Sequence, residues 1–443
     1  MAIATHVPKV PRRPAHAPVP LPDAPARADR PARGAVVAVA IGLTYVVGHD
    51  GTIGWRAVRV LVLWAVTVLV LRGRTTWGDL QRGAADVVAG AGALAVGVGI
   101  SGPHLVKTGL AAMTVAGFLA LGGGLVLLVS GAGALLRRMG RLWRPPAVAG
   151  LALATIVVLY ALGQAVAATN APPTTVDDET PADRGLVYED VELTAADGVN
   201  LSGWYVPSRN GAAVALLHGA GSTRSGVLDH AEVLAGHGFG VLLYDARGHG
   251  HSDGRAMDFG WYGDADLAGA LAFLQERADV RGGRIGAVGM SMGGEEAIGA
   301  MAGLPGLRAV VAEGATNRVA GDKAWEPDVF GWRGAVQQGL NWLTTRTVDL
   351  LTVADPPVTL RASAATAQRP LLMIAGGDVE AEAHAAAYVQ AGAPEAVEVW
   401  VVPGAGHTGG LDTDPRGWEA RVVSFLLEAL DAGDGPATAT EEE

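Results

Sequence analysis

Apolar residues are distributed in two different patterns along this chain. Five long apolar runs come first, at about 34–48, 57–71, 84–103, 109–130 and 147–168. A helix of about 20 apolar residues crosses the roughly 30 Å of hydrocarbon in a bilayer. The last three runs reach that length, and the first two are shorter and predict a tight hairpin. The pattern therefore predicts a transmembrane region of about five helices over residues 34–168.

Short apolar runs of the β type replace the long ones after residue 186. Strands are expected at 186–193, 201–207, 213–217, 240–244, 285–289, 309–313, 371–375 and 397–402. The first two are joined through Asp197-Gly198 and predict an antiparallel pair. Most of the others alternate with helical segments, which is typical of a mostly parallel, doubly wound sheet covered on both faces. An α/β domain is therefore predicted over residues 186–432.

Four further segments complete the predicted organisation. Residues 169–185 carry prolines and acidic residues and predict a linker. The Pro/Arg-rich segment 1–33 and the acidic segment 433–443 are expected to be disordered tails, because neither has apolar periodicity. The insertion 316–369 is expected to be either a helical cap over the active site or ordinary helices packed on the sheet.

The charge of the chain is divided in the same way as its hydropathy. Residues 1–168 contain 16 Lys+Arg and 5 Asp+Glu, whereas residues 169–443 contain 17 and 39. A basic half that is also strongly apolar indicates a membrane partner and not a nucleic acid. The chain has no cysteine, which excludes disulfides and cysteine-based metal sites.

The arginines between the apolar runs predict an orientation in the membrane. If the N-terminus is inside, thirteen Lys+Arg lie in the inside segments, and the outside turns hold little beyond Arg56, Arg59 and Lys107. Basic residues are retained on the cytoplasmic side of a membrane. We therefore expect a multi-pass protein of the cell membrane with a cytoplasmic N-terminus and an extracytoplasmic α/β domain.

One motif in the second half predicts a nucleophile. Gly289-Met290-Ser291-Met292-Gly293 lies between an expected strand and an Ala-rich helix, which is the sequence form of a nucleophile elbow. Side chains two positions before and after the serine would collide in such a turn, and Gly289 and Gly293 avoid the collision. The alternative is a Gly-rich tight turn that carries a solvated serine.

Three more segments supply the partners that a serine nucleophile needs. His218-Gly219-Ala220-Gly221 follows an expected strand, Asp378 follows the strand at 371–375, and His407 lies in a Gly-rich loop before the last helix. A serine hydroxyl needs a base within hydrogen-bond reach, and the base needs a carboxylate to orient it. The chain order of serine, acid and histidine is typical of α/β-hydrolases.

With these motifs and the loop Asp245–Ser252, residues 186–432 resemble the α/β-hydrolase superfamily, in particular its membrane-linked, serine-aminopeptidase-like and monoglyceride-lipase-like members. The resemblance implies roles for five residues. Ser291 would be the nucleophile, His407 the general base and Asp378 the acid. The oxyanion hole would be formed by the backbone N–H groups of Ala220 and Met292. His249 and His251 would belong to a structural turn.

The acid is the least defined of these assignments. The segment Gly376–Glu382 lacks the proline that usually follows the acid in this superfamily, and it contains Glu380 and Glu382 as rivals. Asp378 is favoured because it is nearest the end of the strand.

We therefore expect a membrane-anchored serine hydrolase that cleaves a small-molecule or lipid acyl ester through an acyl-enzyme. The alternatives are an amide or peptide hydrolase that uses the same residues, and a hydrolase-like domain that only binds a ligand. No metal and no cofactor is expected, because the chain has no metal-binding or nucleotide-binding motif.

Overall fold

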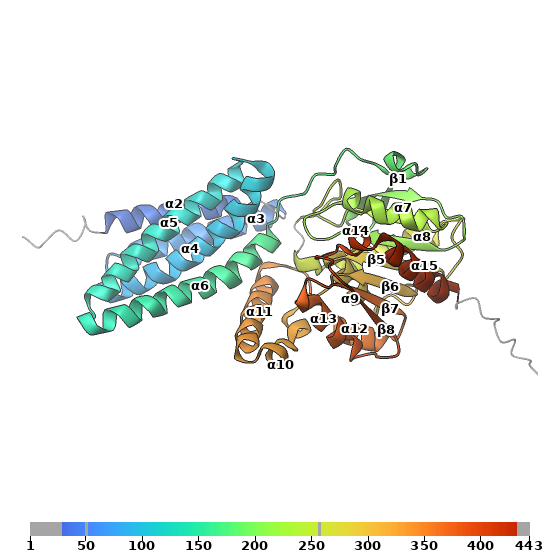
Figure 1. The fold of residues 1–443 in the computed structure, drawn as a ribbon. Helices are drawn as coiled ribbons and strands as arrows, with labels where there is room; N and C mark the ends of the chain where they lie inside the picture. Colours follow the sequence, from blue (N-terminus) through green and yellow to red (C-terminus); the bar gives the residue numbers. More distant parts are fainter. Residues whose placement is uncertain (1–28, 49–51, 256–257, 432–443) are drawn as a thin grey trace, which may run out of the picture.

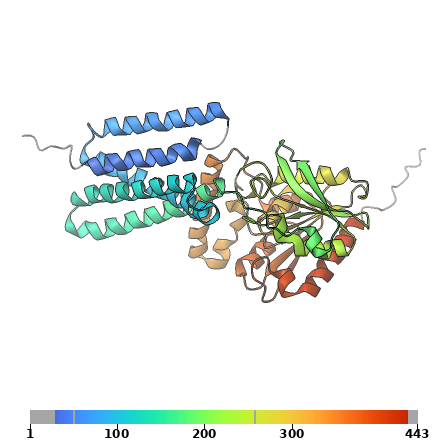
Figure 2. The same ribbon diagram turned by 90° about the horizontal axis from the view of Figure 1, so that it is seen from above.

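A computed structural model describes residues 29–48, 52–255 and 258–431. It consists of a helical bundle followed by an α/β domain, and the two lie side by side (Figures 1 and 2). The predicted tail 433–443 and most of the predicted tail 1–33 lie outside the described residues. Residues from Arg30 onward are helical, so the end of the segment 1–33 was wrongly expected to be disordered.

The bundle contains the five predicted long helices, which together indicate a multi-pass membrane protein. They are α2 (Arg30–Gly48), α3 (Ile53–Gly73), α4 (Asp79–Thr108), α5 (Ala112–Arg137) and α6 (Arg144–Thr169). Each contains a stretch that is long and apolar enough to cross a membrane, and the predicted spans are confirmed to that extent.

Small residues bring α4 and α5 into close contact. A Cβ atom on Gly90 would lie 2.5 Å from the backbone nitrogen of Leu128, and one on Gly97 would lie 2.6 Å from that of Leu121. Since no side chain fits at these two positions, glycine permits backbone-to-backbone packing of the kind that holds membrane helices together.

Eight strands form one mixed sheet in the second domain. The strands are β1 (Glu189–Thr194), β2 (Asn200–Val206), β3 (Ala213–Leu217), β4 (Gly240–Tyr244), β5 (Ile285–Met290), β6 (Ala309–Glu313), β7 (Leu371–Gly376) and β8 (Val397–Val402). Their order is β1-β2-β4-β3-β5-β6-β7-β8. The β1–β2 and β2–β4 pairs are antiparallel and the others are parallel, so the predicted fold class is confirmed.

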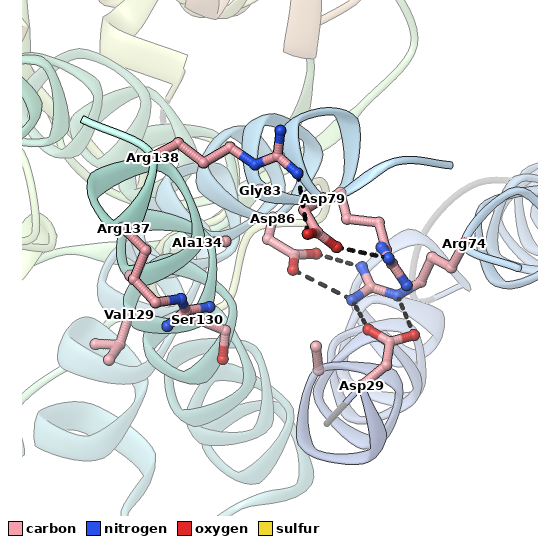
Figure 3. Close-up of a pocket in the computed structure, with 13 residues that line it drawn as sticks. Asp29, Arg74, Asp79, Gly83, Asp86, Val129, Ser130, Ala134, Arg137 and Arg138 are labelled. Carbon is pink, nitrogen blue, oxygen red and sulfur yellow. Dashed lines mark hydrogen bonds and ion pairs between the residues drawn. The ribbon is translucent and has the colours of Figure 1, made fainter. Parts of the chain in front are cut away.

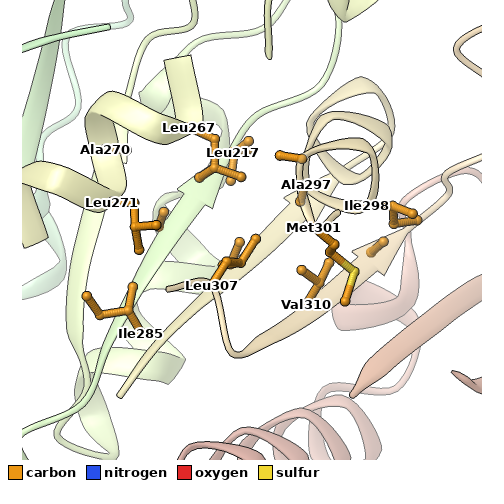
Figure 4. Close-up of a cluster of buried hydrophobic side chains, with 14 of the residues drawn as sticks. Leu217, Leu267, Ala270, Leu271, Ile285, Ala297, Ile298, Met301, Leu307 and Val310 are labelled. Carbon is orange, nitrogen blue, oxygen red and sulfur yellow. The ribbon is translucent and has the colours of Figure 1, made fainter. Parts of the chain in front are cut away.

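Helices cover both faces of this sheet because neighbouring residues of each strand point to opposite sides. On one side Leu217 and Val310 pack with side chains of α8 (Gly263–Gln275) and α9 (Met292–Ala300), as Figure 4 shows. On the other side Leu216 packs in a second cluster with side chains of α7 (Leu228–Gly236) and α15 (Pro415–Asp431). The core of the domain therefore lies in two buried clusters, one on each face of the sheet.

The insertion between β6 and β7 forms three helices with two different partners. They are α10 (Glu326–Phe330), α11 (Trp332–Leu351) and α12 (Leu360–Ala367). Helix α12 packs against α9 and α13 (Glu380–Gln390) in the domain, whereas α11 packs against the membrane helix α6 (Figure 1).

The segment that links the two domains makes contacts with both of them. Lys107 at the end of α4 donates a hydrogen bond to Thr174 Oγ1 (2.5 Å), and the Thr174 hydroxyl donates to the carbonyl oxygen of Gly221 (3.1 Å). The segment predicted as a linker therefore connects the bundle directly to the Gly219–Gly221 loop.

Candidate active site

Ser291 lies in a strained turn between β5 and α9. Its φ and ψ angles are 52° and −118°, which a non-glycine residue rarely adopts. A Cβ atom on Gly289 would lie 2.3 Å from the Gly293 carbonyl oxygen, and one on Gly293 would lie 2.7 Å from that of His218. The collisions expected from the sequence are therefore real, and the glycines allow the serine to occupy the turn.

His407 lies next to this serine, in the loop that follows β8. Its Nε2 atom is 2.8 Å from Ser291 Oγ, so the ring can accept the hydroxyl proton. The ring can lie this close to Ser291 only because residue 314 is a glycine. Gly314 has a φ of 70°, and a Cβ atom at this position would lie 2.9 Å from Cε1 of His407. The imidazole side chain remains about half exposed, at 51 %.

The carboxylate that contacts His407 belongs to Glu382 and not to Asp378. Glu382 Oε1 accepts a hydrogen bond from His407 Nδ1 at 2.6 Å, and Oε2 accepts one from the backbone N–H of Gly376 at 2.8 Å. Glu382 is buried, whereas Asp378 is exposed in the turn after β7. The expectation that Asp378 orients the imidazole is thus corrected, and Glu380, the other rival, is also exposed.

The geometry of a helix start explains this correction. Side chains in a helix point back toward its N-terminus. Glu382 lies in the first turn of α13, so its carboxylate reaches back to the end of β7. Asp378 is nearer to the strand in sequence, but it precedes the helix and faces solvent.

The hydrogen bond that His407 donates to Glu382 raises the pKa of His407 above its ordinary value, and this effect outweighs the opposing effect of partial burial. The negative charges of Glu382, Glu295 and Glu313 act in the same direction. A carboxylate that stabilises the imidazolium makes the neutral ring a stronger base. The arrangement therefore favours proton transfer from Ser291 to His407.

Glu313, the last residue of β6, connects the serine turn to the histidine loop. Its carbonyl oxygen accepts a hydrogen bond from the backbone N–H of Ser291 at 2.7 Å. Its carboxylate accepts the backbone N–H of Gly410 at 2.6 Å and the indole N–H of Trp418 at 2.9 Å. Glu313 is buried and thus forms hydrogen bonds with the turn at Ser291, with Gly410 at the end of the His407 loop, and with Trp418 on α15.

Two histidines fix the loop that follows β3. His218 Nδ1–H donates to the carbonyl oxygen of Gly219 at 2.8 Å, and Nε2 accepts the backbone N–H of Ala246 at 3.0 Å. Burial lowers the pKa of His218 to about 4, so the ring stays neutral and keeps both bonds. His249 Nε2 accepts the backbone N–H of Gly221 at 3.3 Å. Both side chains therefore shape the loop that carries Ala220.

Ser291, Ala220 and Met292 line one cavity of about 270 Å³. Met292 is the first residue of α9, whose free N–H groups favour a developing negative charge. Glu295, one turn further along α9, also lines the cavity. Its Oε1 accepts backbone N–H groups from Thr316 (3.0 Å) and Asn317 (2.8 Å), and burial raises its pKa to about 7.

The remaining walls of this cavity come mainly from two parts of the chain. Asn317, Lys323, Asn341 and Thr345 belong to the insertion, the last two on α11, and Tyr160 and Gln164 belong to the membrane helix α6. None of these residues was singled out from the sequence. Gln164 carries a signal that could have been noticed, because it is a polar residue near the end of an otherwise apolar span.

A second cavity, of about 710 Å³, lies at the end of the bundle that points away from the hydrolase domain (Figure 1), and Figure 3 shows the residues that line it. There the guanidinium of Arg74 is buried and forms ion pairs with Asp29 and Asp86. These pairs tie the start of α2 to the end of α3 and the start of α4. A buried arginine without such partners would be strongly destabilising, so the cluster explains how these helix ends stay together.

Comparisons with known proteins agree with this fold. Residues 208–353 match the family described as serine aminopeptidase, S33. The chain is 32% identical over 254 residues to Rv2307c of Mycobacterium tuberculosis, an uncharacterized protein, and the match covers 56% of this chain and 78% of the relative. YfhR of Escherichia coli strain K12 is 31% identical over 131 residues, which is 28% of this chain and 45% of that protein.

Among solved structures, the Pyrococcus furiosus esterase Pf2001 aligns over 59% of this chain and 98% of its own, with 25% sequence identity and a TM-score of 0.48. Together with the eight-stranded sheet and the elbow at Ser291, the sequence matches define the second half of the protein. The chain belongs to the α/β-hydrolases of the serine aminopeptidase S33 family, with five long apolar helices preceding the hydrolase domain.

Proposed function

We propose that the protein is a membrane-anchored serine hydrolase that cleaves an acyl ester. The observation that carries the proposal is the line of hydrogen bonds from Ser291 Oγ through both ring nitrogens of His407 to Glu382. This set of groups is what a serine needs to act as a nucleophile at neutral pH.

In the proposed reaction His407 Nε2 takes the hydroxyl proton while Ser291 Oγ bonds to the ester carbonyl carbon. The backbone N–H groups of Ala220 and Met292 stabilise the oxyanion. The bond to the leaving alkoxide then breaks, and His407 donates its proton to that oxygen. Water, activated by the same imidazole, hydrolyses the acyl-enzyme and regenerates Ser291.

The test is labelling of the full-length protein by a fluorophosphonate together with turnover of p-nitrophenyl acetate. We expect the wild type to label and to turn over, and Ser291→Ala to do neither. Failure of the wild type to label would instead support a domain that only binds a ligand. Parallel assays with an aminoacyl anilide decide between ester and amide hydrolysis.

We further propose that the hydrolase domain lies outside the cytoplasm. The support is the distribution of arginines described above, since the stretch from the end of α5 to the start of α6 contains Arg137, Arg138, Arg141 and Arg144. With that segment inside, α6 carries the chain to the opposite side.

A further inference from the structure

Helix α6 is both a membrane span and part of the candidate active site. Tyr160 and Gln164 on α6 line the same cavity as Ser291. The two residues are four positions apart, so they lie on one face of the helix. Another wall is formed by α11, which packs against α6 and donates a hydrogen bond from Gln337 Nε2 to Tyr160 Oη at 2.8 Å.

The position of these residues along α6 places them near the surface of the membrane. Helix α6 starts at Arg144 and two prolines, after which its residues are mostly apolar. Because about 20 residues cross the hydrocarbon, a span that begins at Ala147 ends near residue 166. Tyr160 and Gln164 then fall in the last third of the span, at the level of the leaflet next to the hydrolase domain.

The side chain of Gln164 is exposed although its neighbours in the span are apolar. A polar group inside a span is costly unless it faces a polar cavity, and it therefore marks a functional site. The cavity next to Ser291 supplies that environment.

Helix α11 extends the same surface toward the bilayer. Gln337 meets Tyr160, whereas Val348 is packed in one cluster with Ala165. Since Tyr160 lies deeper in the span than Ala165, the N-terminal half of α11 is the half nearer the bilayer. Exposed apolar side chains occur along the whole of α11, and in the half nearer the bilayer Trp332 is 75% and Val336 55% exposed. An aromatic and apolar surface at this level fits the acyl chains and headgroups of a leaflet.

The end of α4 is also linked to the candidate site, at the Gly219–Gly221 loop. Thr174 links Lys107, at the end of α4, to the carbonyl oxygen of Gly221. Helix α6 therefore lines the cavity and α4 is linked through Thr174 to the Gly219–Gly221 loop, which a simple anchor would not require.

We propose that the substrate is an amphiphilic acyl ester resident in the bilayer, and that it reaches Ser291 between α6 and α11 and contacts Tyr160 and Gln164. This inference rests on the proposed hydrolase function and assigns its substrate class. The two α6 residues are specificity-determining residues, because their side chains face the substrate while the reacting groups belong to the hydrolase domain.

The test uses full-length protein in phosphatidylcholine vesicles and two substrates, a long-chain monoacylglycerol in the vesicle and soluble p-nitrophenyl acetate. For Tyr160→Ala and Gln164→Leu we expect kcat/KM for the vesicle ester to fall about tenfold or more, which corresponds to the loss of roughly one good contact. Turnover of the acetate, which lacks the long acyl chain, should fall much less, so that the ratio of the two kcat/KM values drops. Leu125→Ala, which removes an exposed apolar side chain from α5, is the matched control and should leave kcat/KM for both substrates unchanged.

An equal loss on both substrates, or no loss on either, would overturn the inference. These results differ from failure of the proposed function, in which the wild type itself neither labels with fluorophosphonate nor hydrolyses the acetate.

A second measurement does not depend on turnover. Because the chain has no cysteine, Gln164→Cys and Leu125→Cys can each carry one environment-sensitive dye. Reaction of Ser291 with a long-chain alkyl fluorophosphonate should shift the emission at position 164 and leave it unchanged at position 125. A wild-type rate of labelling without a shift at position 164 would also overturn the inference.

Discussion

Oε1 of Glu382 lies 2.6 Å from Nδ1 of His407, although Asp378 is closer to the end of β7 in sequence. The bond fixes the ring with Nε2 toward Ser291.

Glu382→Gln should lower kcat on the order of 10⁴-fold, because the amide holds the His407 ring in the wrong tautomer. Asp378→Asn and Glu380→Gln are matched controls on exposed neighbours and should retain activity within about threefold. Steady-state kinetics on a soluble ester distinguish the three, and a severe loss in Asp378→Asn alone would refute the assignment.

The pH dependence of kcat/KM should follow the ionisation of His407. The base must be neutral to accept a proton, so activity is lost as the pH falls through its pKa. Glu382 raises that pKa, and the acid limb of the wild type should therefore have its midpoint above 6.5. In Glu382→Gln the residual activity should show a midpoint at lower pH. A midpoint that rises or stays constant in this variant would contradict the proposed coupling.

Replacement of Gly314 should displace the imidazole of His407 without changing that residue itself. Gly314→Ala adds a methyl group 2.9 Å from the His407 ring and strains a backbone with a φ of 70°. We expect kcat to fall more than about tenfold, since misplaced catalytic groups are costly. Gly185→Ala is the control, because its φ is 72° and nothing lies within 4 Å. It should lose about 1–2 kcal/mol of stability at most and no activity per folded molecule. Equal activity of the two variants would contradict the expectation.

Alkaline-phosphatase fusions test the orientation, because the reporter is active only after export. Fusions after residue 171 should be active, and fusions near residue 140 should be inactive. The reason is that export of the Arg137–Arg144 segment opposes the positive-inside bias. The opposite pattern would place the hydrolase domain in the cytoplasm.

Most of the fold could be predicted from the sequence because its signals are local. Apolar runs defined the five long helices, and six of the eight strands begin at the predicted residue. The elbow was equally local, since its glycines flank Ser291. Glu382 could only be named as a rival, because its role depends on how the first turn of α13 points back to the strand. The contact of α6 with α11 joins residues 177 positions apart, and no periodicity encodes such a pair.

The hydrogen bonds of Glu313 have a consequence for how the molecule keeps its geometry over time. Ser291 and His407 are 116 positions apart in the chain and lie on separate connections. Both connections are fastened to the same residue, one through its backbone carbonyl and the other through its carboxylate at Gly410. A shift of β6 therefore displaces both partners in the same direction. The hydroxyl of Ser291 and the ring of His407 are thus positioned from one residue, and we expect thermal distortion of the surrounding sheet to change their common position more than their separation.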